Sequence, residues 1–305
     1  ANVVVEGFRP GVMERLGLDY KSCKKLNPGI VYCSISGYGQ DGPYKYKAGH
    51  DINYIGYAGV LDQIGLSGGP PAIPNIQIGD IMGGALVPAM SILAVLLESQ
   101  RTGEGRYIDV SMTDAVISHN YQALSSLVSV GVAGKRGSDL LSGKVPCYST
   151  YETKDHKYVA VGALEKKFWD NLCNVLKRPD LKKHHWQNET ADFELAKKEL
   201  EHIFSGETRA HWVRVFDEED CCVSPVISLD EALDDPQIQK RKMIFGTEHP
   251  ISGRSLQFST PFKMTDYQVS EDIPAPKQGQ HTKAILEEIG FSEGDIKRFG
   301  DAVRF

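Results

Sequence analysis

Residues 30–43 read IVYCSISGYGQDGP, an apolar run rich in β-branched residues that ends in a glycine-rich turn. Val, Ile and Tyr favour an extended backbone, and a mostly apolar run is typical of a strand covered on both faces. The glycines and the proline of 37–43 predict that the strand ends near residue 36. We therefore predict a buried strand over 30–36, followed by a loop.

Further strand-like runs lie on both sides of this segment and alternate with helical ones. Residues 3–6 and 107–111 are apolar runs that predict strands. The apolar residues of 50–61 are spaced as on one side of a helix, and longer apolar helices are predicted over 80–100 and 112–128. Such alternation indicates an α/β unit with helices on both faces of a mostly parallel sheet.

A polar stretch rich in Gly and Ser, 135–147, separates this unit from a second one. Apolar runs on both sides of KDHK at 154–157 predict a β-hairpin. Charged amphipathic helices are predicted over most of 166–217, and 221–228 has the composition of a strand. We predict a large α/β domain with its linker at 1–147, a small α+β domain at 148–255 and a tail at 256–305.

The composition excludes several classes of protein. With 305 residues, 41% hydrophobic and 24% charged, the chain is typical of a soluble globular protein and not of a disordered one. A formal charge of −6 gives no basic excess for nucleic acid or an anionic membrane. The uncharged stretches 81–97 and 115–134 contain Gly and Pro or polar residues, which favours core helices over membrane spans.

The cysteines and histidines show no metal-binding or redox pattern. The six cysteines lack CxxC spacing, and the nine histidines include no HExxH. We therefore expect mostly buried thiols and no zinc site. His184 and His185 fall in a polar stretch, which predicts that they lie at the surface.

Three residues are candidates for chemistry, and each is predicted to lie where a helix begins: His50, Asp80 and Glu165. Local hydrogen bonding or a helix-start carboxylate explains His50 and Glu165 without any catalysis. Asp80 is explained equally well as a cap for backbone N–H groups. The nearby Gly83 and Gly84 are less well explained by capping. They would let a ligand approach N–H donors that could stabilise an oxyanion.

The order of several motifs resembles the type III CoA-transferase/racemase family, and within it the α-methylacyl-CoA racemases. The motifs are VEGFRPGVMERLG (5–17), GYGQDGP (37–43), AGHDINY (48–54), GD with GG (79–84), TGEG (102–105), DVSMTD (109–114), GALE (162–165), SPV (224–226), PAP (274–276) and GQHT (279–282). Together they cover nearly the whole chain and are far more specific than any one of them.

The resemblance implies a fold and an assembly. The fold is a Rossmann-like large domain joined to a smaller α+β domain, and residues 256–305 would return to the large domain. Family members carry further strands before the one at 3–6, so the large domain is expected to lack its N-terminal part here. The implied assembly is an interlocked homodimer, with each active site between the large domain of one subunit and the small domain of the other.

The resemblance also implies a 1,1-proton transfer at the carbon α to a thioester. His50 and Asp80 would be the acid–base pair on its two faces, and Glu165 would pair with His50. Histidine changes protonation state near neutral pH, and a desolvated carboxylate can be made to do so. N–H groups at the start of the helix that opens at Asp80 would stabilise the enolate. No metal or other cofactor is implied, because coenzyme A is part of the substrate.

The partner that the resemblance implies is an acyl-CoA thioester, and neither nucleic acid nor a membrane is expected. Arg9 and Arg15 match phosphate-contacting arginines, although from the residues alone they are equally well surface charges. The remaining substrate-binding residues implied are Gly37, Tyr54, Gly83, Gly84 and Tyr148. Because the chain has no Ser-Lys-Leu ending, we expect a bacterial cytoplasmic protein, or a peroxisomal or mitochondrial one in a eukaryote.

A CoA-transferase on the same fold is the main alternative. There the residue matching Asp80 would be a nucleophile that forms an aspartyl–CoA thioester. A histidine at position 50 with a partner at Glu165 favours the racemase. Ile76, where racemases often carry Asn, leaves a transferase or another epimerase open. A non-catalytic relative is a third hypothesis, against which the retention of all three candidate residues argues.

Overall fold

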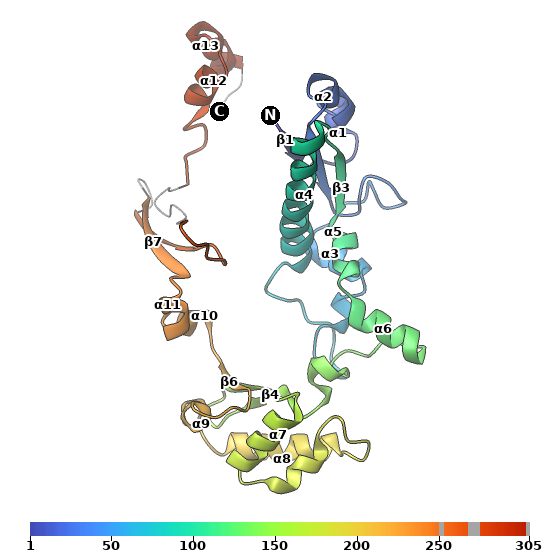
Figure 1. Cartoon of the computed structure of the whole chain (residues 1–305), viewed down its shortest axis with the longest axis vertical. Helices are drawn as coiled ribbons and strands as arrows, with labels where there is room; N and C mark the ends of the chain where they lie inside the picture. The colour runs from blue at the N-terminus through green and yellow to red at the C-terminus, as the bar shows by residue number, and fades with distance from the viewer. Residues whose placement is uncertain (250–252, 268–274, 303–305) are drawn as a thin grey trace. The chain divides into compact units, whose positions relative to one another are not determined.

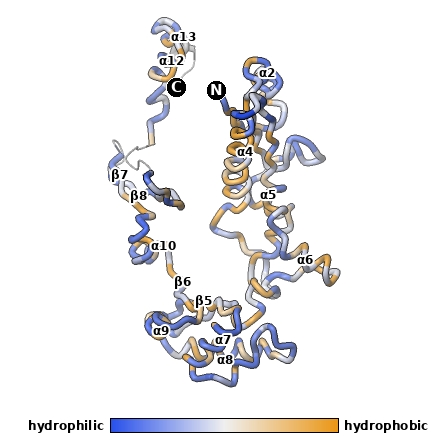
Figure 2. The backbone as a smooth tube through the Cα atoms, in the orientation of Figure 1, coloured by the Kyte–Doolittle hydropathy of each residue, from blue (hydrophilic) through white to orange (hydrophobic). Residues whose placement is uncertain are grey.

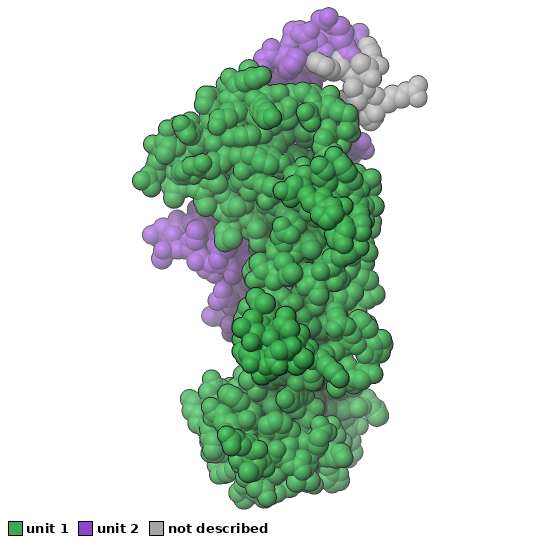
Figure 3. All heavy atoms as spheres, turned by 90° about the vertical axis from the view of Figure 1, so that its right-hand side faces the viewer, with its two compact units in different colours: residues 1–226 green, residues 227–305 purple. Residues whose placement is uncertain are grey.

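The computed structural model describes residues 1–249, 253–267 and 275–302 and divides into two compact units, 1–226 and 227–305 (Figure 1; Figure 3, green and purple). Residue 274 of the PAP motif and the last three residues, 303–305, lie outside the described residues. The predicted small domain at 148–255 therefore spans the boundary between the two units.

The first part of unit 1 is built on a parallel sheet of three strands. Its order is β1 (Val3–Glu6), β2 (Val31–Ser36) and β3 (Tyr107–Ser111), with Val5 opposite Cys33 and Cys33 opposite Ile108. The first four residues of β2 are buried, as the apolar run predicts. All three predicted strands are confirmed, and so is a mixed α/β fold.

Helices form the crossovers that parallel strands require. Between β1 and β2 lie α1 (Val12–Arg15) and α2 (Tyr20–Leu26). Between β2 and β3 lie α3 (Asp51–Tyr57), the short 3₁₀ turn η1 (Leu61–Gln63), η2 (Gly79–Leu86) and α4 (Val87–Thr102). The last two form one continuous helix, so the predicted long helix is confirmed.

The start of this long helix is wound as a π-helix. η2 passes into α4 directly before Pro88. Proline has no N–H to donate to the carbonyl four residues earlier, which accounts for a wider turn just before it.

The continuous helix over Gly79–Thr102 has the length and apolar composition that could cross a membrane, and Figure 2 shows α4 mostly in orange. Four of its large apolar side chains are 61–66% exposed in the single chain: Leu86, Met90, Leu93 and Leu97. Their spacing of four, three and four residues places them on one face of the helix. We call this face the apolar stripe.

The predicted single helix over 112–128 is wrong, because it is two helices. They are α5 (Met112–Ser118) and α6 (Tyr121–Val130). At the break, the Ser118 hydroxyl donates to the carbonyl of Ala115 at 2.8 Å, and Nδ1 of His119 lies 2.7 Å from the same oxygen. Side chains that bond a nearby carbonyl compete with the helical N–H, and the apolar pattern does not reveal this.

The second part of unit 1 has its own core. The antiparallel sheet β4 (Tyr148–Glu152), β5 (Tyr158–Gly162) and β6 (Val223–Val226) confirms the predicted hairpin. The helices with it are η3 (Leu140–Lys144), α7 (Lys166–Val175), η4 (Pro179–His184), α8 (Phe193–Ser205) and α9 (Arg209–Phe216). Trp169, Tyr151 and Phe204 are fully buried at its centre.

The predicted surface position of His184 and His185 is wrong. Both are buried, at 5% and 1% exposure. Nε2 of His185 lies 2.8 Å from the carbonyl of Leu164, and Nδ1 of His184 accepts from the N–H of Asp192 at 3.0 Å. Backbone partners make burial of these polar rings acceptable, and such partners are not visible in a polar stretch of sequence.

Unit 2 contains a two-stranded sheet and four short helices among its described residues. The antiparallel strands are β7 (Ile244–His249) and β8 (Gly253–Phe258). The helices are α10 (Leu229–Leu233), α11 (Pro236–Lys240), α12 (Thr282–Glu288) and α13 (Glu293–Ala302). The return of residues 256–305 to the large domain stays a prediction.

Candidate active site

A cavity of about 470 Å³ opens at the carboxyl ends of the parallel strands. Residues that follow each strand line it: Arg9 after β1, Gly37 after β2 and Met112 after β3. His50 and Tyr54 line it as well. The carboxyl edge of an open α/β sheet is where ligands bind in this class of fold. Four predicted site residues therefore share one cavity.

His50 is the cap residue at the start of α3. Its backbone is extended, and its N–H donates to Oδ1 of Asn53 at 3.0 Å. The side chain of Asn53 thus fixes the backbone from which the imidazole projects. His50 itself is exposed at the cavity.

Tyr54 holds the loop that leads to His50. The tyrosine is 8% exposed, and its hydroxyl donates to the carbonyl of Gly49 at 2.5 Å. A Cβ atom at Gly37 would lie 2.2 Å from the Tyr54 ring, and one at Gly49 would lie 2.7 Å from it. The ring therefore fits only because both positions are glycine.

We expect Gly37→Ala to lower the free energy of unfolding by about 1–3 kcal/mol, the usual cost of overpacking. The added methyl group would push against the buried Tyr54 ring and shift the backbone that carries His50. Urea unfolding followed by fluorescence measures the effect.

Gly56→Ala is the matched control, because a Cβ atom there meets nothing within 4 Å. Alanine in the α3 interior should be neutral or stabilising by up to about 1 kcal/mol. An equal loss of unfolding free energy in the two variants would show that the contact between Gly37 and the Tyr54 ring is not what makes Gly37→Ala destabilising.

Asp80 lies in the first turn of η2, and Asp51 connects this turn to α3. Oδ1 of Asp51 accepts from the N–H of Gly79 at 2.6 Å and from the N–H of Asp80 at 3.0 Å. The N–H of Ile81 donates to the carbonyl of Gln77. The expectation that the start of this helix offers free donors to an enolate is therefore wrong for these N–H groups.

The surroundings of Asp80 raise the pKa of its carboxyl group. Desolvation by burial is the first cause, and the negative charge of Asp51 is the second. The charge of His50 acts in the opposite direction, so His50 and Asp80 are electrostatic neighbours. A carboxyl group with a raised pKa exchanges its proton more readily near neutral pH than an ordinary one.

Asp51 contacts the turn that carries Asp80, and the sequence reasoning did not single it out. It stands directly after His50, and an acidic residue in the first turn of α3 is already explained by the helix dipole. Its partners lie 28 and 29 residues away along the chain. No local signal points to them.

Asp80 and the remaining predicted residues do not line this cavity. Gly83 is buried against α5, where a Cβ atom would lie 2.7 Å from Cα of Met112, and Gly84 faces the Met112 sulfur. These two glycines allow η2 and α5 to pack closely. Arg15 is exposed and lines neither this cavity nor the one of about 290 Å³ that Arg9 also borders.

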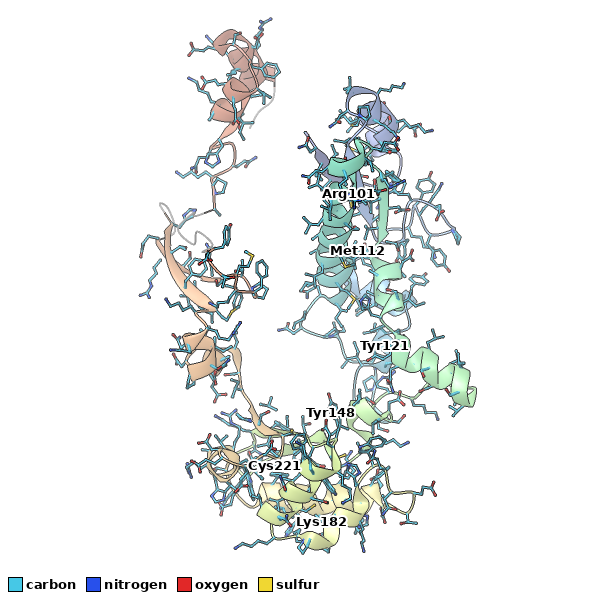
Figure 4. The ribbon with its side chains drawn as sticks, viewed as in Figure 1. Arg101, Met112, Tyr121, Tyr148, Lys182 and Cys221 are labelled. Carbon is cyan, nitrogen blue, oxygen red and sulfur yellow. The ribbon has the colours of Figure 1, made fainter. Side chains whose placement is uncertain are left out.

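Glu165 and Tyr148 lie in the second part of unit 1, and neither is part of its buried core. Glu165 is the residue at the N-cap position of α7, but its side chain makes no capping hydrogen bond. Burial raises the pKa of the Cys222 thiol, and the negative charge of Glu165 raises it further. Tyr148 lines a different cavity of about 640 Å³, and Figure 4 labels Tyr148 and Met112. Neither residue lines the cavity of His50 within one chain. Among the described residues, no group of three or more His, Cys, Asp or Glu side chains could hold a metal ion.

Residues 1–282 match the family model described as CoA-transferase family III. The chain belongs to CoA-transferase family III. Its relatives in this family include human alpha-methylacyl-CoA racemase, 35% identical over 97% of this chain and 76% of the relative. They also include mouse succinyl-CoA:glutarate CoA-transferase, 29% identical over 97% of this chain and 69% of the relative.

Solved structures support the same family III fold. A CAIB/BAIF family protein from Brucella suis superposes with a TM-score of 0.78 at 24% identity, covering 95% of this chain and 75% of that one. Rv3272 from Mycobacterium tuberculosis gives 0.77 at 24% identity, over 94% and 77% of the two chains. The family model and the named relatives make this protein an enzyme of the family III CoA-transferase and racemase superfamily, and those relatives include both racemases and transferases.

Proposed function

We propose that this enzyme is a racemase or epimerase of 2-methylacyl-CoA thioesters that works by 1,1-proton transfer. One observation carries the proposal: Asp80, whose carboxyl group has a raised pKa, is an electrostatic neighbour of His50, and His50 lines the cavity at the carboxyl edge of the sheet. The reaction needs two side chains that can each take up and release a proton, one on each face of the α-carbon.

In the proposed reaction, the Asp80 carboxylate removes the α-proton from one enantiomer. The electron pair of the C–H bond moves into the thioester and forms an enolate. Protonated His50 then gives a proton to the opposite face of the same carbon. The other enantiomer reacts in the reverse order, with neutral His50 as the base and protonated Asp80 as the acid.

The enolate oxygen needs donors, and the start of η2 is occupied by Asp51. The first N–H groups of a helix have no acceptor within that helix. Those of Asp51 and Ile52 follow His50 at the start of α3. We assign the stabilisation of the enolate to them.

Cationic side chains at the cavity suit the phosphates of coenzyme A. Arg9, Lys45 and Lys47 all line it. Arg15, Gly83, Gly84 and Tyr148 stay predicted contacts of the acyl-CoA. We propose no metal or redox cofactor, because both proposed proton transfers use side chains of the protein. As the compartment we propose the cytoplasm.

We propose a homodimer in which Glu165 of a second copy pairs with His50, because Glu165 does not line the cavity of His50 within its own chain. The apolar stripe is the surface that we expect the second copy to cover, since exposed apolar faces of this kind mark interaction sites. If a second copy covers the apolar stripe, the exposed apolar side chains of this helix are explained without a membrane.

We expect Leu93→Glu to shift the protein from dimer to monomer, because the new charge would be buried in the interface. Light scattering at several concentrations measures the mass. Leu26→Glu is the matched control, since Leu26 is 91% exposed and lies on α2, not on the helix that carries the stripe. An undisturbed dimer for Leu93→Glu would show that the stripe is not the interface.

A CoA-transferase remains the second candidate, favoured by transferases among the relatives. The deciding experiment incubates the protein with one enantiomer of a 2-methylacyl-CoA in D₂O without an acceptor acid and follows the α-proton by NMR. Exchange with inversion supports the racemase. No exchange, followed by transfer of CoA to an added carboxylic acid, would make Asp80 a nucleophile and the enzyme a transferase.

A further inference from the structure

Asp51 joins the helix that carries His50 to the helix that carries Asp80. It is the first residue of α3, directly after the His50 cap, and its Oδ1 accepts from the N–H groups of Gly79 and Asp80. A Cβ atom at position 79 would lie 3.1 Å from this oxygen and 3.6 Å from Cβ of Tyr54. The absence of a side chain at Gly79 therefore permits this short connection.

We propose that Asp51 is the positioning residue of Asp80: its carboxylate anchors the turn that carries Asp80 and places a second negative charge beside it. This inference rests on the proposed function, in which Asp80 exchanges a proton with the substrate. The two effects are separable, because the hydrogen bonds need an acceptor oxygen and the electrostatic effect needs a charge.

The groups that face Asp80 come mainly from α3. They are the like charge of Asp51, the opposing charge of His50 and the Tyr54 phenol, whose pKa is raised by burial and further by neighbours that include Tyr38, Asp80 and Asp51. From α5, Met112 and Ala115 lie against Gly83 and Gly84 of η2 and carry no charge, and no charge of α5 is among the causes of the raised pKa of Asp80. Asp51 is therefore the group whose charge favours the protonated form of Asp80, beyond the effect of burial.

Two substitutions separate these effects. Asp51→Asn keeps a carbonyl oxygen for the two N–H groups and removes the charge, so the pKa of Asp80 should fall. Asp51→Ala removes the acceptor as well and frees the turn. Because displacement of a reacting group by about 1 Å costs about 10²-fold, we expect a loss of that order in kcat for Asp51→Ala and substantial rescue by Asp51→Asn.

The first experiment titrates Asp80 directly, without substrate. Protein labelled with ¹³C at the aspartate carboxyl groups is followed by NMR against pH, and the Asp80 signal is identified by its loss in Asp80→Asn. We expect its midpoint at lower pH in Asp51→Asn than in wild type. Asp235→Asn is the control, because Asp235 also accepts from two successive N–H groups, at the start of α11. An unchanged Asp80 midpoint would overturn the inference.

The second experiment records the pH profile of kcat/KM for the enantiomer from which Asp80 removes the proton. Its acidic limb should move to lower pH in Asp51→Asn and stay in place in Asp235→Asn. If Asp51→Asn loses as much activity as Asp51→Ala while both stay folded by circular dichroism, the anchoring role is wrong. A wild-type protein without racemisation would overturn the proposed function, and the NMR titration would still test Asp51.

Discussion

Replacing His50 with alanine is expected to lower racemisation at least about 10²-fold, the scale of general acid–base catalysis. The variant would lack the group that delivers or removes the proton on one face of the α-carbon. Asp80 would still remove the proton from one enantiomer, so this enantiomer should continue to exchange its α-proton with D₂O without inversion. Chiral chromatography measures racemisation, and NMR measures exchange.

The control for this variant is His202→Ala, since His202 is exposed on α8 and distant in sequence from the cavity. It should racemise at the wild-type rate. Near-normal racemisation by His50→Ala would remove His50 from the mechanism. Loss of exchange with both enantiomers in a folded protein would contradict the assignment of separate faces to the two residues.

Replacing Asp80 with alanine is expected to cause a loss of the same size, at least about 10²-fold. The retained exchange should now belong to the opposite enantiomer, because neutral His50 is the remaining base. This mirror pattern separates the racemase from the transferase: a protein that uses Asp80 as a nucleophile has no reason to retain exchange of either enantiomer.

The control for Asp80 is Asp230→Ala, which removes an exposed carboxylate from the first turn of α10 in unit 2. We expect wild-type racemisation from it. If Asp80→Ala keeps exchange with the same enantiomer as His50→Ala does, the two residues do not act on opposite faces and the mechanism is wrong.

Much of the fold could be predicted because its signals are local. The three parallel strands are short apolar runs bounded by Gly or polar turns, and the hairpin in the second part of unit 1 has the same pattern. The break between α5 and α6 could not be predicted, because it depends on side chains that bond the carbonyl of Ala115. Likewise, the burial of His185 depends on a carbonyl 21 residues away.

Of the candidate site, the shared cavity was predictable only in part, because Asp80 does not line it. The residues at the cavity lie in motifs that a sequence can reveal, and Arg9, Gly37, His50 and Tyr54 do share it. What was not predictable is the pairing of Asp51 with the start of η2, since it joins segments far apart in the chain. We expected the N–H groups at the start of η2 to be free for an enolate. Those of Gly79 and Asp80 instead donate to Asp51.

The packing of the Tyr54 ring against Gly37 and Gly49 has a consequence for substrate binding. One ring contacts Gly37 and Gly49 together, so both ends of the segment between them are fastened to a single side chain. The entropy lost on closing such a loop is then lost when the protein folds, before any ligand arrives. Binding of the thioester therefore does not have to order this segment, and its affinity is not lowered by that cost. We expect residues 37–49 to be equally protected against hydrogen exchange with and without bound acyl-CoA.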